Sequence, residues 1–302
     1  MRIWLWIAPA VALAAADKVA VPAGLDAYLP APESNPITRE KVELGKRLFF
    51  EKQLSRDNSI ACATCHDPQR AFTDERPVGV GVGGRTGNRR VPRIVNRGYG
   101  KSFFWDGRAA SLEEQVLQPI QNPKEMDLTL VEVTARTGLP VETVRQALAT
   151  YVRTILSGDA PYDRYLGGNP EALTAEQRAG LRLFRGKAGC TACHLGPNFT
   201  DERFHNTGIG WPHDEGRYGV THAERDRGAF KTPSLREAAR AAPYMHDGSL
   251  KTIEEVIDFY DQGGKPNPAL DPEIRALKLT AEEKAALAAF LRALIGTVRD
   301  GM

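Results

Sequence analysis

Apolar residues recur at helical spacing in several segments of this chain, whereas a period of two residues is nowhere sustained. The segment E-L-G-K-R-L-F (43–49) places Leu and Phe on one helix face, and R-A-G-L-R-L-F (178–184) repeats that pattern in the second half. A third helix is predicted by five apolar positions, Val141, Val144, Leu148, Val152 and Ile155. The Ser157-Gly158 pair should stop this third helix.

Helix start signals agree with this pattern. A Ser or Thr followed three residues later by Glu or Gln is typical of a capping box, in which each side chain bonds the other residue's backbone N–H. We take four such pairs as helix starts, Ser111–Glu114, Thr174–Gln177, Thr252–Glu255 and Thr280–Glu283. The chain also contains 28 Gly and 20 Pro, so we expect a mostly α-helical fold with long loops.

The chain is an imperfect duplication. Each of the two similar helices precedes a C-x-x-C-H motif, C-A-T-C-H at 62–66 and C-T-A-C-H at 190–194. This arrangement predicts two cytochrome-c-like domains. We place the boundary near the Pro- and Gly-containing stretch 161–170, which gives domains at 17–165 and 166–302.

The first sixteen residues differ from the rest of the chain. Arg2 is followed by the apolar run I-W-L-W-I-A-P-A-V-A-L, and A-A-A precedes Asp17. This order is typical of a secretory signal peptide, so we expect residues 1–16 to be removed on export to the periplasm. A retained membrane anchor is the alternative, although the run is short for a bilayer. No later segment is apolar enough to suggest a membrane span in the mature chain.

Charge and glycine content exclude some partners. The 40 basic and 38 acidic residues nearly cancel, which argues against a nucleic-acid or polyanion partner. The glycine-rich run at 79–88 lacks the G-K-[ST] ending of a phosphate-binding loop. We expect a flexible loop there.

The four cysteines carry the clearest chemical signal, because all of them belong to the two C-x-x-C-H motifs. This motif is the attachment signature of a c-type haem, and it predicts two covalently bound haem c groups. The haem-bonding residues would be Cys62, Cys65, Cys190 and Cys193. His66 and His194 would each supply one axial iron ligand. Two disulfides, a redox C-x-x-C or a zinc site explain two such similar pentapeptides less well.

The second axial position of the first haem decides the function class. The other histidines all follow the second motif, namely His205, His213, His222 and His246. Residues 67–193 contain no His and a single Met, Met126. We therefore predict an open position at the first iron, with Met126 or a residue of the other domain as alternatives. An open position allows a small oxidant to bind, whereas a closed one permits only electron transfer.

Four further stretches carry a family resemblance. They are F-W-D-G-R-A-A-S-L-E-E-Q (104–115), P-I-Q-N-P-K-E-M (119–126), F-K-T-P-S-L-R (230–236) and P-Y-M-H-D-G-S-L (243–250). Together with both haem motifs they resemble the bacterial di-haem cytochrome c peroxidases over roughly residues 35–300. The resemblance implies a peroxidatic first haem and an electron-transfer second haem.

The resemblance also implies roles for single residues. Glu125 matches the distal carboxylate that moves a proton during O–O cleavage. Trp105 matches the tryptophan between the two haems, and Gln115 and Pro119 match residues of the distal pocket. A solvated Glu125 and a Trp105 that serves only core packing are the structural alternatives.

The second haem's sixth ligand distinguishes the branches of the family. Peroxidases that store a reducing electron have Met fourteen residues beyond the His of P-Y-x-H, and here that position is Tyr260. Tyrosine at this position resembles the MauG-like branch. A phenol oxygen favours oxidised iron, whereas a Met sulfur favours the reduced state. Met245 is the rival ligand.

Two departures from the family pattern concern the calcium site and the activation of the first haem. No histidine matches the distal His that leaves the first haem on reductive activation, so we expect peroxide to react with the resting, oxidised state. The family's calcium ligands are an Asn and a Thr carbonyl, which here correspond to Arg90 and Ala241. A guanidinium cannot ligate a cation, so calcium is doubtful, and we hypothesise that Arg90 replaces its charge.

The sequence therefore predicts an exported di-haem peroxidase of the MauG-like branch that reduces hydrogen peroxide. Electrons would come from a small periplasmic cytochrome c or cupredoxin, or from a protein substrate. A non-catalytic di-haem electron carrier is the alternative.

Of the remaining histidines, we expect His246 to hydrogen-bond near a haem edge and His205 to lie beside a propionate, while His213 and His222 should be solvated.

Overall fold

The computed structural model describes residues 17–302, so the predicted signal peptide lies outside the described residues. The α-helices are α1 (Arg39–Phe49), α2 (Cys62–Cys65), α3 (Leu112–Gln115), α4 (Leu117–Gln121), α5 (Leu130–Thr137), α6 (Val141–Arg153), α7 (Pro161–Leu166), α8 (Ala175–Arg185), α9 (Tyr218–Thr221), α10 (Ile253–Asp261) and α11 (Ala281–Arg292). The strands are β1 (Ile155–Gly158), β2 (Phe204–His205), β3 (Phe230–Lys231) and β4 (Thr297–Asp300).

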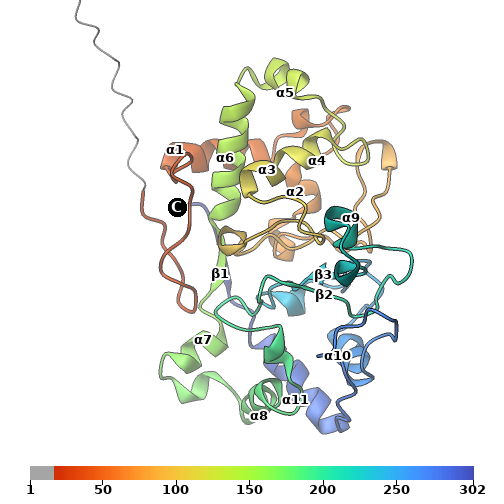
Figure 1. The fold of residues 1–302 in the computed structure, drawn as a ribbon. Coiled ribbons are helices and arrows are strands. Elements are labelled where there is room, and N and C mark those ends of the chain that lie inside the picture. The colour runs from red at the N-terminus through yellow and green to blue at the C-terminus, as the bar shows by residue number, and fades with distance from the viewer. Residues whose placement is uncertain (1–16) are drawn as a thin grey trace, which may run out of the picture.

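Two apolar cores organise these elements. The first is built on α1 and α6 and the second on α8 and α11. Figure 1 shows the first group at the top of the molecule and the second at the bottom, with β2, β3 and several loops between them. In the described chain no helix is long and apolar enough to cross a membrane.

The two principal helix pairs repeat the same close contact. A Cβ added to Gly45 would lie 2.0 Å from the carbonyl oxygen of Ala147, and one added to Gly180 would lie 1.9 Å from that of Ala286. Both distances are far below van der Waals contact, so only glycine lets the helix backbones approach this closely. The duplication seen in the sequence therefore extends to the packing of both halves.

The helix predicted to run to Ser157 ends earlier, which corrects that expectation. Helix α6 stops at Arg153, and Ile155 begins strand β1, which pairs antiparallel with β4. The side chain of Asn96 also accepts a bond from the Ser157 N–H and donates to its carbonyl. These partners are distant in sequence, so helical spacing alone could not reveal them.

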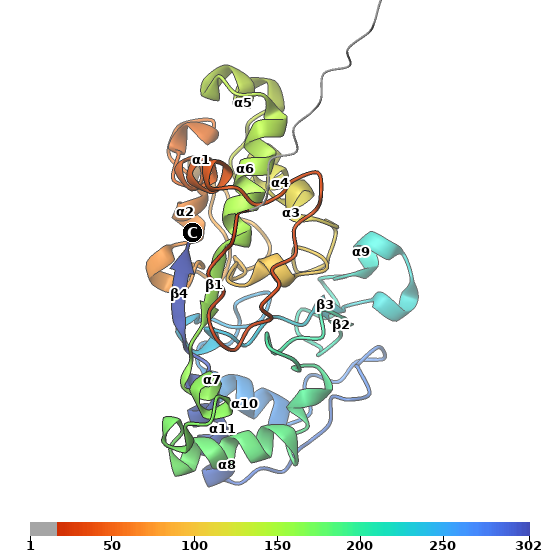
Figure 2. The same cartoon turned by 90° about the vertical axis from the view of Figure 1, so that its left-hand side faces the viewer.

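Strand β4 also joins the first core, although the prediction counted it with the second domain. Val298 packs against that core, and the Tyr151 hydroxyl donates to Asp300 over 2.8 Å. Figure 2 shows β4 beside β1, next to the first group of helices. The boundary near 161–170 remains a prediction.

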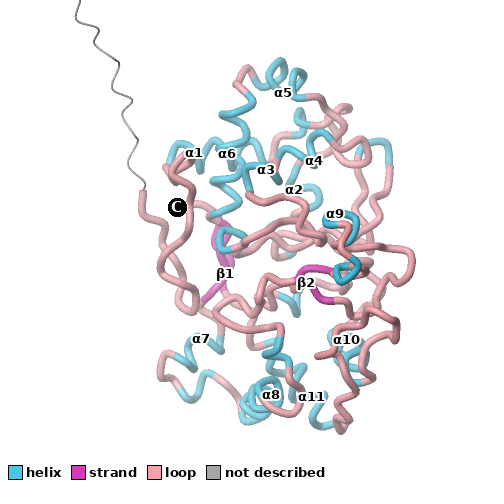
Figure 3. Tube along the Cα trace, viewed as in Figure 1, coloured by secondary structure: helices cyan, strands magenta, loops and turns pink. Residues whose placement is uncertain are grey.

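The fold is more helical than stranded, as expected, but the fraction of residues in helices is lower than a mostly α-helical fold implies. Helices outweigh strands, yet loops and turns make up more than half of the described residues (Figure 3). Thr174 and Thr280 form complete capping boxes. Ser111 and Thr252 cap their helices too, but the paired Glu114 and Glu255 accept from Ala110 and Lys251, one residue earlier than expected.

Candidate active site

The two motif histidines are prepared to ligate iron. The Nδ1 atom of His66 lies 3.1 Å from the Phe72 carbonyl oxygen, and that of His194 lies 2.9 Å from the Phe199 carbonyl oxygen. A carbonyl partner fixes the proton on Nδ1, which leaves the Nε2 lone pair free for a metal. Burial lowers the pKa of both histidines, which favours the neutral, ligating form.

A cavity of about 880 Å³ lies against the first motif and includes Cys62, Cys65 and His66 in its wall. All four cysteines, which fall within the described residues, are free thiols, so none is consumed by a disulfide. Free thiols, an oriented imidazole and a large cavity beside them are what a c-type haem requires. The residues present therefore fit the group that the motif implies.

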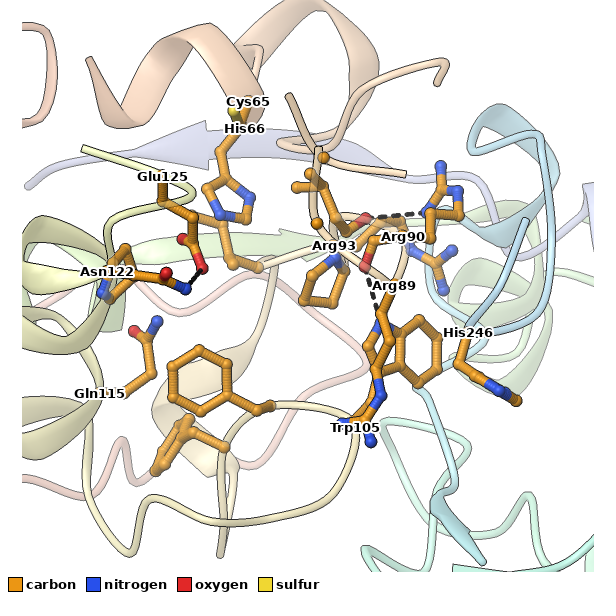
Figure 4. A pocket seen from close by; sticks show the side chains of 18 of the residues that line it. Cys65, His66, Arg89, Arg90, Arg93, Trp105, Gln115, Asn122, Glu125 and His246 are labelled. Carbon is orange, nitrogen blue, oxygen red and sulfur yellow. Dashed lines mark hydrogen bonds between the residues drawn. The ribbon is translucent and has the colours of Figure 1, made fainter. Parts of the chain in front are cut away.

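Glu125 and Gln115 share a wall of this cavity with Pro119. Figure 4 shows both labelled side chains on the same side of His66. The Asn122 side chain donates to Glu125 Oε1 over 2.7 Å, and the Glu125 N–H donates to the Asn122 carbonyl over 2.9 Å. Burial raises the pKa of Glu125, although the Asn122 bond and the charge of Arg108 oppose the rise. A raised pKa suits a carboxyl that must both accept and return a proton.

The glycine-rich run packs directly on this carboxylate segment, a role that the sequence did not reveal. The Val82 N–H donates to the Glu125 carbonyl over 2.9 Å. A Cβ added to Gly81 would lie 2.3 Å from the Lys124 carbonyl oxygen and 2.4 Å from that of Glu125. Gly81 is therefore required for close backbone approach.

Trp105 lies where the two halves meet. Its Nε1 donates to the Arg90 carbonyl over 2.8 Å, and its ring makes an edge contact with His246 at a centroid distance of 6.4 Å. His246 stacks on Phe230 with centroids 3.5 Å apart. Burial lowers the pKa of His246 to about 4, so this ring is neutral at physiological pH.

Trp105 and His246 occupy equivalent positions in the duplication. Each follows a residue at φ +67° and precedes Asp-Gly. The Lys231 N–H donates to the Trp105 carbonyl over 2.8 Å, and the Arg90 N–H donates to the His246 carbonyl over 2.7 Å. Each half thus holds the ring-bearing segment of the other.

This equivalence also shows which residue of the first half corresponds to Tyr260, the predicted axial ligand. Fourteen residues after His246 stands Tyr260, and fourteen after Trp105 stands Pro119. Proline has no side-chain donor atom for a metal. The fourteen-residue spacing could be counted in the sequence. The matched backbone geometry at Trp105 and His246 is what shows that the two segments correspond.

Tyr260 lies near the second motif. Burial raises the pKa of its phenol, and the charges of Cys193 and Cys190 add to the rise. Met245 is partly buried and adopts a left-handed backbone conformation. The preference for Tyr260 over Met245 stays a prediction that this proximity supports. Met126 is almost fully buried and also borders the first cavity.

Both ring nitrogens of His205 lie against protein carboxylates, and its placement beside a propionate stays a prediction. Its Nδ1 lies 2.6 Å from Asp271 and its Nε2 lies 2.9 Å from Asp201. The Cys193 sulfur and these two carboxylates raise the pKa of His205 to about 10. The imidazolium is thus already neutralised by protein groups. His213 and His222 are exposed.

Comparison with known proteins agrees with this geometry. The family described as di-haem cytochrome c peroxidase matches residues 39–171. The chain is 41% identical to the methylamine utilization protein MauG of Methylorubrum extorquens, over 88% of this chain and 81% of that protein. It is 35% identical to the cytochrome c551 peroxidase of Pseudomonas aeruginosa, over 76% of each chain.

A solved structure extends the likeness to the whole fold. The crystal structure of a MauG-like protein associated with microbial copper homeostasis superposes with a TM-score of 0.82 and 32% identity, covering 97% of this chain and 96% of that one. The chain belongs to the di-haem cytochrome c peroxidase family that includes MauG, and it is an oxidoreductase with two c-type haems.

Proposed function

We propose that this enzyme reduces hydrogen peroxide at the haem held by His66. The observation that carries the proposal is the cavity in which Glu125 and Gln115 face His66, while Pro119 stands where the second half has Tyr260. When bound, the haem supplies an iron at which peroxide can accept two electrons. With two protons, these electrons convert one peroxide into two water molecules.

The chain's own residues would position and protonate the substrate. Glu125 takes a proton from one peroxide oxygen and returns it to the other, the general acid–base step that heterolytic cleavage needs. Asn122 holds one carboxylate oxygen of Glu125, so the other oxygen is left for the substrate. The Gln115 amide can hydrogen-bond the same small ligand.

Electron supply is the second part of the proposal. Trp105 lies between the halves and would pass electrons from the haem held by His194 and Tyr260. The donor would be a small periplasmic cytochrome c or cupredoxin, or an oxidisable residue of a protein substrate. The similarity to MauG proteins and the position of Tyr260 support the second option, and the expected export signal supports a periplasmic location.

One spectroscopic experiment separates this enzyme from a simple electron carrier. The ferric, haem-loaded protein should show a high-spin component that disappears on adding one equivalent of peroxide. A fully low-spin spectrum that peroxide leaves unchanged would support the carrier and refute the proposal. Neither result depends on knowing the physiological donor.

We also propose that Arg90 replaces the inter-half cation expected from the family. Its guanidinium donates to the backbone carbonyls of Val91, Asp74 and Ala241 over 2.9–3.0 Å, and more weakly to that of Ala242. Arg90 is only 4% exposed. Carbonyl oxygens converging on a buried positive group are what a calcium site would offer, so the charge is supplied here by the chain itself.

A further inference from the structure

Five arginines line the first haem cavity, and they differ in how their charge is balanced. They are Arg89, Arg90, Arg93, Arg97 and Arg108. Four of them are engaged by acceptors of the protein. Arg97 pairs with Glu202 at 2.6 Å, and Arg89 and Arg108 both pair with Asp106, at 2.6 and 3.0 Å. Arg90 has its ring of carbonyls.

Arg93 has the fewest partners of the five, a single carbonyl, whereas Arg90, which also lacks a carboxylate, bonds several carbonyls. One terminal nitrogen, Nη2, donates to the Ser234 carbonyl. The Nε atom is enclosed and has no hydrogen-bond partner. No ion pair joins Arg93 to a carboxylate within residues 17–302. A buried guanidinium without an anion is costly, because its desolvation is not repaid.

The charge of Arg93 nevertheless persists. Burial, with a smaller contribution from neighbouring Arg90, lowers its pKa to about 10, so the group remains a cation at neutral pH. The charges of Tyr244 and Glu237 oppose this fall only in part, so a closer anion would further stabilise the guanidinium. Arg93 is among the residues that line the cavity.

The position of Arg93 identifies that anion. It follows Pro92, in the segment whose Arg90 carbonyl holds Trp105, and Ser234 follows Pro233 in the equivalent segment of the second half. In Figure 4, Arg93 lies across His66 from Glu125, so it is on the side of Trp105 rather than that of the proposed peroxide pocket. A c-type haem carries two propionate carboxylates, and these are the anions that a haem bound in this cavity would bring to Arg93.

We propose that Arg93 binds a propionate carboxylate of the haem held by His66, on the side that faces the second half. The guanidinium is a strong charged donor to a carboxylate and would offer its remaining terminal nitrogen, Nη1, because Nη2 already bonds Ser234 and Nε is enclosed. This inference rests on the proposed haem at His66, but not on its peroxidase activity. A neutralised propionate stabilises the reduced iron, so Arg93 would raise the reduction potential of this haem.

The test compares haem-loaded Arg93→Gln and Arg93→Lys with a control, Arg85→Gln. Arg85 is an exposed arginine of the glycine-rich run that bonds Asp127 and the Pro123 carbonyl. The readout is the midpoint potential of each haem, after haem content has been measured. Arg93→Gln should shift the one-electron equilibrium of the His66 haem toward ferric by about tenfold, ~59 mV. Arg93→Lys should recover part of the shift, and the control should show none.

Other outcomes decide against the inference. Unchanged potentials in a fully loaded Arg93→Gln protein would overturn it. If Arg93→Gln fails to mature, the crystal structure of the haem-loaded wild type decides, since a guanidinium bound to a free anion or only to carbonyls would also refute it. A protein that binds no haem at His66 would instead refute the proposed function.

Discussion

Replacing Glu125 by glutamine tests the proposed proton transfer most directly. The change keeps shape and polarity, because a Gln oxygen can still accept the 2.7 Å bond from the Asn122 amide. What it removes is the ability to hold and release a proton. General acid–base groups contribute about 10² to 10⁴ in rate, which corresponds to roughly 3–5 kcal/mol of activation free energy.

The assay is stopped-flow reaction of the ferric protein with peroxide, monitored at the haem absorption band. We expect Glu125→Gln to lower the second-order rate constant about 10² to 10⁴-fold while the resting spectrum is retained. The matched control is Glu273→Gln, at an exposed residue of a loop in the second half, which should react like the wild type.

The pH dependence gives a second measure of the same group. Burial raises the pKa of Glu125, so its base form is lost as the pH falls through a value above the ordinary Glu range. The rate constant should decline there in the wild type, and Glu125→Gln should lack this decline. A variant that reacts at the wild-type rate with the wild-type pH profile would refute the role of Glu125.

Four further predictions follow from the structure. Pro119→Tyr, which copies the second half, should make the first haem six-coordinate and low-spin in absorption spectra and block its reaction with peroxide. Tyr260→Phe should abolish any long-lived peroxide-oxidised spectrum but leave initial peroxide binding intact; an unchanged lifetime would exclude Tyr260 as the ligand. Metal analysis should find no stoichiometric calcium, and one calcium per chain whose removal abolishes activity would contradict the proposal for Arg90. Asp163→Ala should lower the free energy of unfolding in urea by about 3–5 kcal/mol, because it leaves the buried Arg236, 2.6 Å away, unpaired; a change under about 1 kcal/mol would show that the pair is replaceable.

Local sequence determined the parts of this protein that depend on neighbouring residues. The two C-x-x-C-H motifs set where haem can attach, because attachment needs only residues within one short segment. Thr174 and Thr280 set two helix starts through bonds to residues three positions away. The equivalence of Trp105 with His246, and of Pro119 with Tyr260, is likewise written in the spacing of the chain.

Tertiary structure decided what depends on segments far apart in the chain. Ile155 was predicted to be helical, but pairing with β4 places it in a strand. Folding brought the glycine-rich run onto the backbone of Glu125, enclosed Arg90 in carbonyls, and gave His205 two carboxylate partners. Such contacts form only when distant segments meet, and their hydrogen bonds and charges then fix the state of each group. The spacing of residues along the chain does not predict these long-range contacts. The partners of these residues could therefore be identified only from the folded structure.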